Sequence, residues 1–275
     1  MGEREIIERT QALPATVKSL ANDLAALGVV QGSVILVHAS LSSLGWVCGG
    51  AIAVIEAIKA TVGPSGTIVM PTHSGDLSEP SLWSNPPVPR PWWPILRETM
   101  PPFDPRTTPT RGMGAIAECF RTMPGVLRSN HPHVSFAAFG PCASQITSNH
   151  QHEDGLGNSS PLGQLHGLQS SVLLLGVGYG CNTSLHLSEI RALGERTKKV
   201  KTGAPVLANG QREWIEFLEV QLDNSDFSHI GKAFEDSTGL VQSGCVAMGQ
   251  SLLMPQAALV DFGVQWLGAN RVQAP

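Results

Sequence analysis

The sequence has few charged side chains and no long apolar run. Lys, Arg, Asp and Glu make up only 15% of its 275 residues, whereas hydrophobic residues make up 42%. This balance excludes an intrinsically disordered chain, which would be poor in apolar groups and rich in charge. No run of eighteen apolar residues occurs, so no membrane-spanning helix and no membrane partner are expected. The first eleven residues are charged and lack the apolar segment of a secretory signal, which predicts a cytoplasmic protein.

Basic side chains are also scarce. Eighteen Lys and Arg stand against 22 Asp and Glu, for a formal net charge of −4. Proteins that bind nucleic acid neutralise phosphates with clustered basic groups, so no nucleic-acid partner is expected. The length suits one large domain, or a core with a lobe inserted into it. Scattered Trp and Leu residues leave monomer and homodimer both open.

Cysteine is sparse and its spacing suits neither a metal site nor a redox pair. The chain has five Cys and no CxxC motif, which argues against a zinc ribbon and a dithiol centre. Two His-x-His pairs occur, His131/His133 and His150/His152, and in a strand each pair would share one face. A catalytic zinc needs three convergent protein ligands, and no HExxH pattern supplies them. We therefore expect no metal.

Strand-like and helix-like segments alternate along the chain. Continuous β-type runs, typical of parallel strands covered on both faces, occur at 33–38, 67–70 and 171–175. Apolar periodicity predicts helices over 17–27, 51–62, 184–193 and 255–267. Further strands are predicted over 136–139 and 213–220, whereas 246–253 is ambiguous. This alternation predicts an α/β fold, layered α/β/α, with a mainly parallel central sheet.

The composition changes between positions 71 and 110. Eleven of the twenty Pro and three of the six Trp lie there. Proline removes a backbone donor, so this stretch is predicted to hold neither a regular helix nor a central strand. Its tryptophans argue for packing rather than disorder. We expect a single domain over 1–275, with 71–110 inserted as a loop-rich lobe that contributes to substrate or cofactor binding.

One predicted strand end leads into a segment rich in Ser and Gly. Ligands of parallel α/β sheets bind beyond the carboxyl ends of the strands, and residues 40–50 follow such an end and precede a helix. Small residues let backbone N–H groups approach an anion, and a helix N-terminus favours negative charge. The segment predicts a pyrophosphate site, with an ordinary turn as the alternative. Gly176–Gly180 is only half a dinucleotide fingerprint, so a nicotinamide cofactor is not indicated.

His186 and Glu189 are the candidate catalytic pair. They stand three apart on a predicted helix and so share one face. A carboxylate beside an imidazole fixes its tautomer and stabilises the imidazolium, whereas the nearby helix N-terminus favours the neutral ring. The spacing predicts a general base for neutral pH, with a surface pair as the alternative. No nucleophile elbow surrounds a Ser or Cys, so direct action on the substrate is preferred to a covalent step through Cys181.

Taken in order along the chain, these motifs resemble the aminoglycoside 3-N-acetyltransferase family. The pieces that carry the resemblance are VHASLSSLG (37–45), GTIVMPT (66–72), TPTRGMG (108–114), RSNHP (128–132), SPLG (160–163), LLGVG (174–178), TSLHLSE (183–189) and ALVDF (258–262). No single motif is decisive, but the order of the motifs along the chain is. The resemblance as a whole extends over about residues 15–267. The resemblance implies an antibiotic acetyltransferase-like fold. It also implies transfer of acetyl from acetyl-coenzyme A to the 3-amine of the 2-deoxystreptamine ring, which confers antibiotic resistance.

The family pattern also implies roles for individual residues. It assigns coenzyme A binding to Ser40, Leu41, Ser42, Ser43, Gly45, Trp46, Val47, Thr72, Thr108, Thr110, Met113, Gly114, Ile116 and Ser135. It makes His186 the base and Glu189 its partner. A thioester is already activated, so neither a metal nor a covalent intermediate is needed.

The substrate implied by the family is a polycation, so its pocket should be lined with carboxylates. The chief candidates are Asp76, Glu153, Asp154 and Asp223, and the further candidates are Glu79, Asp226 and Glu235. For each acid, a solvated surface position is the alternative.

Two other functions stay open. An enzyme of the same fold that acylates a different, biosynthetic amine would keep the coenzyme A loop and His186 but differ in its acidic pocket. A non-catalytic coenzyme A or sugar-binding protein would not need His186 with Glu189. The loop after Thr72 and residues 148–158 depart from the family pattern, so the range of accepted aminoglycosides is left open. The sequence assigns no group to stabilise the oxyanion.

Overall fold

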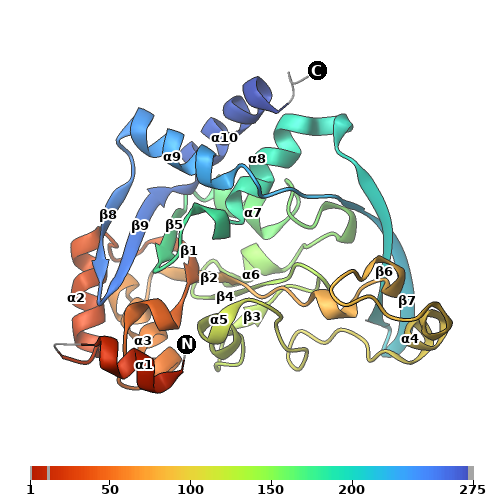
Figure 1. Cartoon of the computed structure of the whole chain (residues 1–275), viewed down its shortest axis with the longest axis horizontal. Helices are drawn as coiled ribbons and strands as arrows, with labels where there is room; N and C mark the ends of the chain where they lie inside the picture. Colours follow the sequence, from red (N-terminus) through yellow and green to blue (C-terminus); the bar gives the residue numbers. More distant parts are fainter. Residues whose placement is uncertain (1, 11–12, 272–275) are drawn as a thin grey trace.

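The fold is built on one seven-stranded sheet (Figure 1). This computed structural model describes residues 2–10 and 13–271. The strands lie in the order β3 (Leu127–Arg128), β4 (Phe136–Phe139), β2 (Thr67–Pro71), β1 (Val34–Ala39), β5 (Ser171–Leu175), β9 (Gly249–Pro255) and β8 (Gln242–Val246). The three central strands β2, β1 and β5 are parallel, and the strands outside them pair antiparallel. The central strands are the three continuous runs that the sequence predicted.

Helices cover both faces of the sheet. One face packs on α2 (Val17–Leu27), α3 (Gly50–Val62) and α5 (Gly114–Arg121). The other packs on α6 (Ala143–Thr147), α7 (Pro161–Gly167), α8 (Ser184–Leu193), α9 (Phe227–Thr238) and α10 (Gln256–Asn270). Successive strand residues face opposite sides, so Ile35 and Val37 enter the first core and Leu36 enters the second. The predicted layered α/β/α fold is confirmed.

The remaining elements are short. They are α1 (Glu3–Arg9), α4 (Trp93–Thr99), and the 3₁₀ turns η1 (Leu41–Leu44), η2 (Gly75–Leu77), η3 (Pro80–Leu82), η4 (Arg90–Trp92), η5 (His152–Asp154), η6 (Tyr179–Cys181) and η7 (Gly194–Arg196). Within the described part of the chain, no helix is both long and apolar enough to cross a bilayer.

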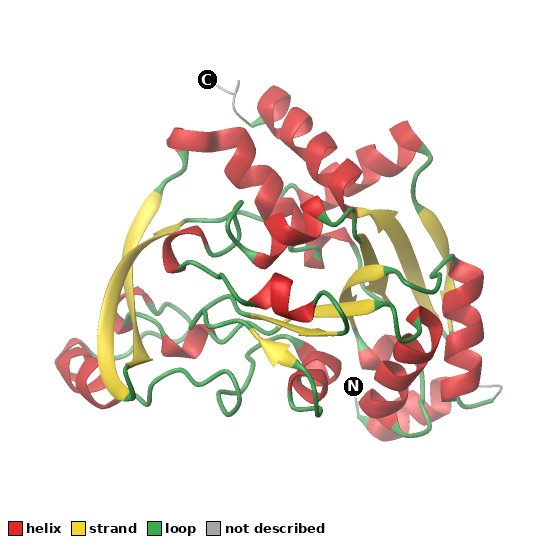
Figure 2. Cartoon of the chain, turned by 180° about the vertical axis from the view of Figure 1, so that it is seen from behind, coloured by secondary structure: helices red, strands yellow, loops and turns green. Residues whose placement is uncertain are grey.

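A two-stranded arm stands apart from the main sheet (Figure 2). It pairs β6 (Lys199–Ala208) with β7 (Gln211–Val220) in antiparallel register. The sequence predicted only part of β7 and missed β6. The signal was present, because Asn209 and Gly210 join the strands with positive φ angles of 51° and 77°, and Asn-Gly is the strongest short hairpin signal. The ambiguous 246–253 segment contains the last residue of β8, the short turn after it and most of β9.

The Pro-rich segment 71–110 contains short turns and one helix. The prediction that it holds no regular helix is wrong for α4, because Pro94 lies in the first helical turn, where a missing N–H costs little. Backbone and side-chain bonds join the segment to the arm. The amide of Phe103 donates to the Pro205 oxygen (2.9 Å), and Arg212 Nε donates to the Met100 oxygen (2.8 Å). The loop-rich segment and the arm therefore form one connected flank of the molecule.

Candidate active site

A cleft of about 610 Å³ opens where the parallel strands end. The ends of β1 and β2, the turn η1, the start of α5 and the turn before α8 form its walls. Five of the residues predicted to bind coenzyme A line it, and these are Ser40, Leu41, Ser42, Met113 and Gly114. Among the described residues that line it there is no Lys or Arg. Anionic groups in this cleft would therefore be held by hydroxyls and backbone N–H groups.

The other predicted residues of the first loop shape that loop and do not line the cleft. They are Ser43, Gly45, Trp46 and Val47. The Ser43 hydroxyl donates to Ser40 Oγ (2.9 Å). The Trp46 amide donates to Thr10 Oγ1 (2.8 Å), which ties the loop to the segment after α1. These contacts fix the loop conformation that presents Ser40 and Ser42.

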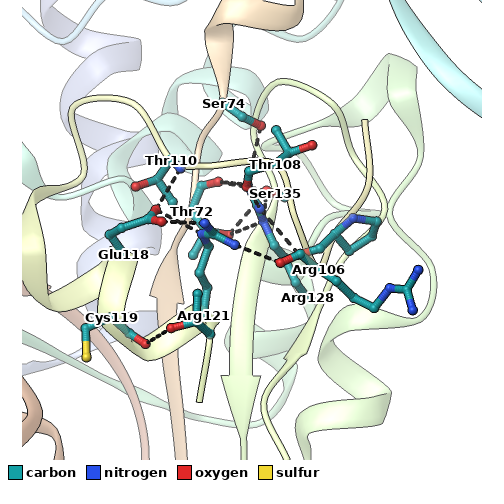
Figure 3. A network of polar contacts seen from close by, with 12 residues as sticks. Thr72, Ser74, Arg106, Thr108, Thr110, Glu118, Cys119, Arg121, Arg128 and Ser135 are labelled. Carbon is teal, nitrogen blue, oxygen red and sulfur yellow. Dashed lines mark hydrogen bonds and ion pairs between the residues drawn. The ribbon is translucent and has the colours of Figure 1, made fainter. Parts of the chain in front are cut away.

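Three more predicted residues surround a half-buried arginine, Arg128 (Figure 3). Arg128 Nε donates to Thr72 Oγ1 (3.2 Å) and Ser135 Oγ (3.0 Å), and its Nη1 donates to the Thr108 carbonyl. Thr72 and Ser135 are wholly buried. Burial lowers the pKa of Arg128 to about 10. The structure thus brings Thr72, Thr108 and Ser135 together, but as partners of Arg128, which the sequence analysis did not single out.

The last two predicted cofactor residues, Thr110 and Ile116, do not line the cleft either. Ile116 is a buried core residue. The Thr110 amide donates to Glu118 Oε2 (2.8 Å), and Arg121 pairs with the same carboxylate. Burial opposes ionisation of Glu118, but hydrogen bonds from Arg121 and Thr110 outweigh it and lower its pKa to about 2. This segment positions Met113 and Gly114 rather than adding groups to the cleft.

His186 and Glu189 meet at the start of α8. His186 Nδ1 lies 3.2 Å from Glu189 Oε2, and the Glu189 side chain is 2% exposed. Its other oxygen accepts from Arg271 Nη1 (2.7 Å) and from the Asp223 amide (3.0 Å). The His186 ring packs edge-on against Phe227, with 4.7 Å between ring centroids. The pair is therefore an oriented unit of a buried carboxylate and a half-buried imidazole, and His186 Nε2 is the nitrogen left for a substrate.

Sequence reasoning missed Arg271 and Phe227. Arg271 also donates to Asp226 Oδ2 (2.9 Å) and bonds the Asp223 carbonyl (3.1 Å). Arg271 lies 82 positions after Glu189, and no local spacing in the sequence relates the two. Only the docking of α10 beside α8 brings them together.

Two further histidines lie at the neighbouring strand ends. Burial, with a smaller contribution from His186, lowers the pKa of both His38 and His73 to about 3. His38 Nε2 lies 3.4 Å from Thr183 Oγ1, and His38 and Thr183 both line the cleft. His73 Nε2 is buried without a hydrogen-bond partner. The sequence analysis marked these strand ends but gave the histidines no role.

The two His-x-His pairs form one cluster away from the cleft. The His131 ring lies 4.7 Å from the His150 ring and 5.6 Å from the His152 ring. His131 Nδ1 accepts from the amides of His133 and Val134 (3.1 Å each), as a neutral ring does. Across residues 2–10 and 13–271, no group of three or more His, Cys, Asp or Glu is arranged to hold a metal ion.

These buried neutral histidines predict that stability falls as the pH drops below 6.5. Burial lowers the pKa of His150 to about 4 and that of His131 well below its ordinary value, as it does for His38 and His73. Below pH 6.5 these histidines bind protons in the unfolded chain but not in the folded chain, so acid favours unfolding. Each such histidine contributes up to about 1.4 kcal/mol per pH unit in this range. Thermal unfolding between pH 7.5 and 5 measures the effect.

A matched pair of variants isolates the histidine contribution. Carboxylates with lowered pKa, such as Glu79 and Glu118 at about 2, lose their contribution only below about pH 4.5. His150→Gln should flatten the fall in Tm between pH 7 and 5, whereas the exposed His229→Gln should not. A Tm that stays constant over this range in the native protein would contradict the prediction.

The predicted substrate acids do not form one group. Glu153 and Asp154 line a small hollow of about 20 Å³ with Glu219 of β7, which the sequence analysis missed. Asp154 Oδ2 also accepts from the Ser159 amide (2.6 Å). Asp223 is exposed and adjoins the Glu189–Arg271 pair.

The fourth predicted acid, Asp76, is elsewhere. It pairs with Arg111 and lines a separate cavity of about 410 Å³ in the Pro-rich segment, beside Trp83. The structure therefore brings Glu153 and Asp154 together and leaves Asp76 apart.

The layered fold thus places an oriented His–Glu pair near a cleft at the ends of its parallel strands. The family described as aminoglycoside 3-N-acetyltransferase matches residues 36–268. The chain belongs to this family.

Its relatives match almost end to end. The SPbeta prophage-derived aminoglycoside N(3')-acetyltransferase-like protein YokD of Bacillus subtilis is 45% identical over 97% of both chains. Aminoglycoside N(3)-acetyltransferase VIII of Streptomyces fradiae is 34% identical over 97% of this chain and 96% of its own.

Solved structures agree. The crystal structure of YokD has a TM-score of 0.95 at 42% identity and covers 99% of this chain and all (100%) of its own. AAC-IIIb, solved with CoASH, has a TM-score of 0.83 at 33% identity and covers 94% of this chain and 97% of its own. AAC-VIa, solved with sisomicin, has a TM-score of 0.83 at 29% identity and covers 94% of this chain and 98% of its own.

Proposed function

We propose that this protein transfers an acetyl group from acetyl-coenzyme A to the 3-amino group of the 2-deoxystreptamine ring of an aminoglycoside, with His186 as general base. The observation that carries the proposal is the oriented His186–Glu189 pair beside a cleft at the strand ends. Membership of the family supports the reaction, and relatives solved with CoASH and with sisomicin support both substrates. The product is an antibiotic that has lost a positive charge, which confers resistance.

The cleft suits acetyl-coenzyme A as the acyl donor. Its walls carry small residues, and Gly112 and Gly114 at the start of α5 face open space or make only ordinary contact. Ser40 and Ser42 supply hydroxyls at its rim. With no Lys or Arg among the described lining residues, the backbone N–H groups of these turns would hold the phosphates. We assign donor binding to this cleft, with Ser40–Ser42 and Met113–Gly114 in direct contact.

The residues of the pair have separate tasks in the transfer. The amine nitrogen attacks the thioester carbon, and His186 Nε2 takes the proton that the amine must lose. Glu189, bonded to Nδ1, stabilises the imidazolium that forms. Arg271 Nη1 donates to the other Glu189 oxygen (2.7 Å) and so holds the carboxylate in place. The carbon–sulfur bond then breaks, and the proton on His186 passes to the departing sulfur.

We assign the acidic surface around the small hollow beside α8 as the place against which the cationic rings bind. Glu153, Asp154 and Glu219 converge there, and Asp223 lies next to the catalytic pair. Exposed carboxylates attract a polycation over long range and are screened by salt. We further infer one acetyltransferase domain over the whole chain, with 71–110 as its lobe, and a cytoplasmic location where acetyl-coenzyme A is available.

The direct test is release of free thiol from acetyl-coenzyme A. Purified protein is incubated separately with gentamicin, kanamycin, neomycin and apramycin, and rapid release with at least one is expected. Mass spectrometry should then place the acetyl group on the 3-amine. Coenzyme A binding without release from any of the four would favour the enzyme that acylates a different amine. Failure to bind coenzyme A would overturn the proposal.

A further inference from the structure

The Thr183 hydroxyl is not used by the helix that it precedes. Thr183 is the N-cap residue of α8, yet its side chain makes no capping hydrogen bond. A Thr at this position ordinarily accepts a bond from the first-turn amides. Here Asn182 Oδ1 takes that role by accepting from the Ser184 amide (3.1 Å). The hydroxyl is therefore free for another task.

That hydroxyl lies in the cleft next to the catalytic base. Thr183 lines the cleft together with His38. Thr183 and His186 stand three apart at the start of α8, and the His186 amide donates to the Thr183 carbonyl (3.1 Å). Side chains three apart at the start of a helix face the same side. An amine that reaches His186 Nε2 therefore meets its acyl donor near Thr183.

His38 orients the hydroxyl. Its Nε2 lies 3.4 Å from Thr183 Oγ1, and burial keeps its pKa at about 3. A neutral imidazole has a single N–H. When Nε2 donates that hydrogen to Thr183 Oγ1, the hydrogen bond occupies one lone pair of the hydroxyl oxygen. The hydrogen of the Thr183 hydroxyl is then directed toward a different acceptor. Because His38 is neutral, it also does not compete with His186 for the proton of the amine.

We propose that Thr183 is the catalytic hydroxyl that donates a hydrogen bond to the thioester oxygen as it becomes an oxyanion, and that His38 is its positioning residue. The inference rests on the proposed function. As the nitrogen–carbon bond forms, the carbonyl electron pair moves onto oxygen, where the Thr183 hydrogen bond stabilises it. When the carbonyl re-forms, the carbon–sulfur bond breaks, and the amine proton reaches sulfur through His186. Thr183 keeps its hydrogen throughout.

The test compares Thr183→Val with Thr183→Ser. Valine keeps the shape and removes the hydroxyl, so kcat should fall by about 10²–10³-fold, as for loss of one oxyanion donor. Serine should stay within about tenfold of the native kcat. The KM values of both substrates, calorimetric coenzyme A binding and Tm should not change, because the hydroxyl caps no helix. The apparent pKa in the kcat/KM profile should also stay fixed, since His186 and Glu189 are intact.

A second pair of variants tests the positioning role. His38→Leu should lower kcat, and His38→Gln, which retains a donor, should recover part of it. His38→Leu added to Thr183→Val should cause little further loss, because the two act as one unit. Native kcat in Thr183→Val, or an equal loss in valine and serine variants, overturns the inference while leaving the transferase function intact. A native protein that neither binds coenzyme A nor turns over overturns the proposed function itself.

Discussion

Replacing His186 by alanine is expected to lower kcat by about 10²–10⁴-fold, the usual contribution of a positioned general base. The imidazole is oriented from one side by Glu189, at 3.2 Å, and from its face by Phe227. Nothing else on the described helix α8 offers a base at that point. Coenzyme A binding should be unchanged in calorimetry, because His186 does not line the cleft. The loss should also be smaller at high pH, where more of the amine is already neutral.

The chain supplies a matched control. His166 also pairs with a carboxylate, its Nε2 lying 3.0 Å from Asp261 Oδ1, but this pair lies at the surface, where Asp261 is 62% exposed. His166→Ala should therefore leave kcat and both KM values within about twofold of the native values, since exposed ion pairs contribute little. A His186→Ala protein with native turnover would remove His186 from the mechanism.

Replacing Arg128 by methionine is expected to cause the largest loss of stability. The guanidinium joins β3 to the end of β2 and to the Pro-rich segment, by bonds to Thr72, Ser135 and the Thr108 carbonyl (Figure 3). It also packs over the Phe103 ring, at 5.0 Å from the ring centroid. Methionine fills much of the volume but leaves those buried oxygens unpaired. The cost should be about 3 kcal/mol or more.

Thermal unfolding measures that cost. In a protein of this size each kcal/mol shifts Tm by about 2 °C, so a fall of at least about 6 °C is expected. Arg106 is the matched control, since it lies in the same network but is 87% exposed and pairs with Asp104. Arg106→Ala should shift Tm by no more than about 1–2 °C. Equal shifts in the two variants would show that the Arg128 bonds do not stabilise the fold.

The sequence was informative wherever a local pattern determines structure. Continuous apolar runs located β1, β2 and β5, and the spacing of His186 and Glu189 placed both on one helical face. The helix predicted over 17–27 is α2, and Gly28, with φ of 107°, ends it. In each case the interactions that determine the local structure join residues within one or two helical turns, or they arise because a strand is buried on both faces.

The rest depends on contacts between distant segments. The partners of Thr72 and Ser135 could not be read locally, because Arg128 reaches Thr72 across 56 positions. A pattern of small hydroxyl residues is equally compatible with a ligand and with a half-buried guanidinium. His38 was visible only as a strand residue, since its low pKa follows from packing on all sides. The β6–β7 arm is the exception, because its Asn-Gly turn is a local signal from which the hairpin could have been predicted.

The tie between Glu189 and Arg271 has a consequence for the order of folding. Arg271 follows α10, the last described helix, and it compensates a carboxylate that is otherwise buried beside His186. A chain emerging from the ribosome can form the central strands and α8 well before α10 exists. Until α10 docks, the Glu189 charge lacks its cation, and burying it is unfavourable. The catalytic pair can therefore be completed only as one of the last events of folding, so activity reports on the finished molecule and not on a partly assembled core.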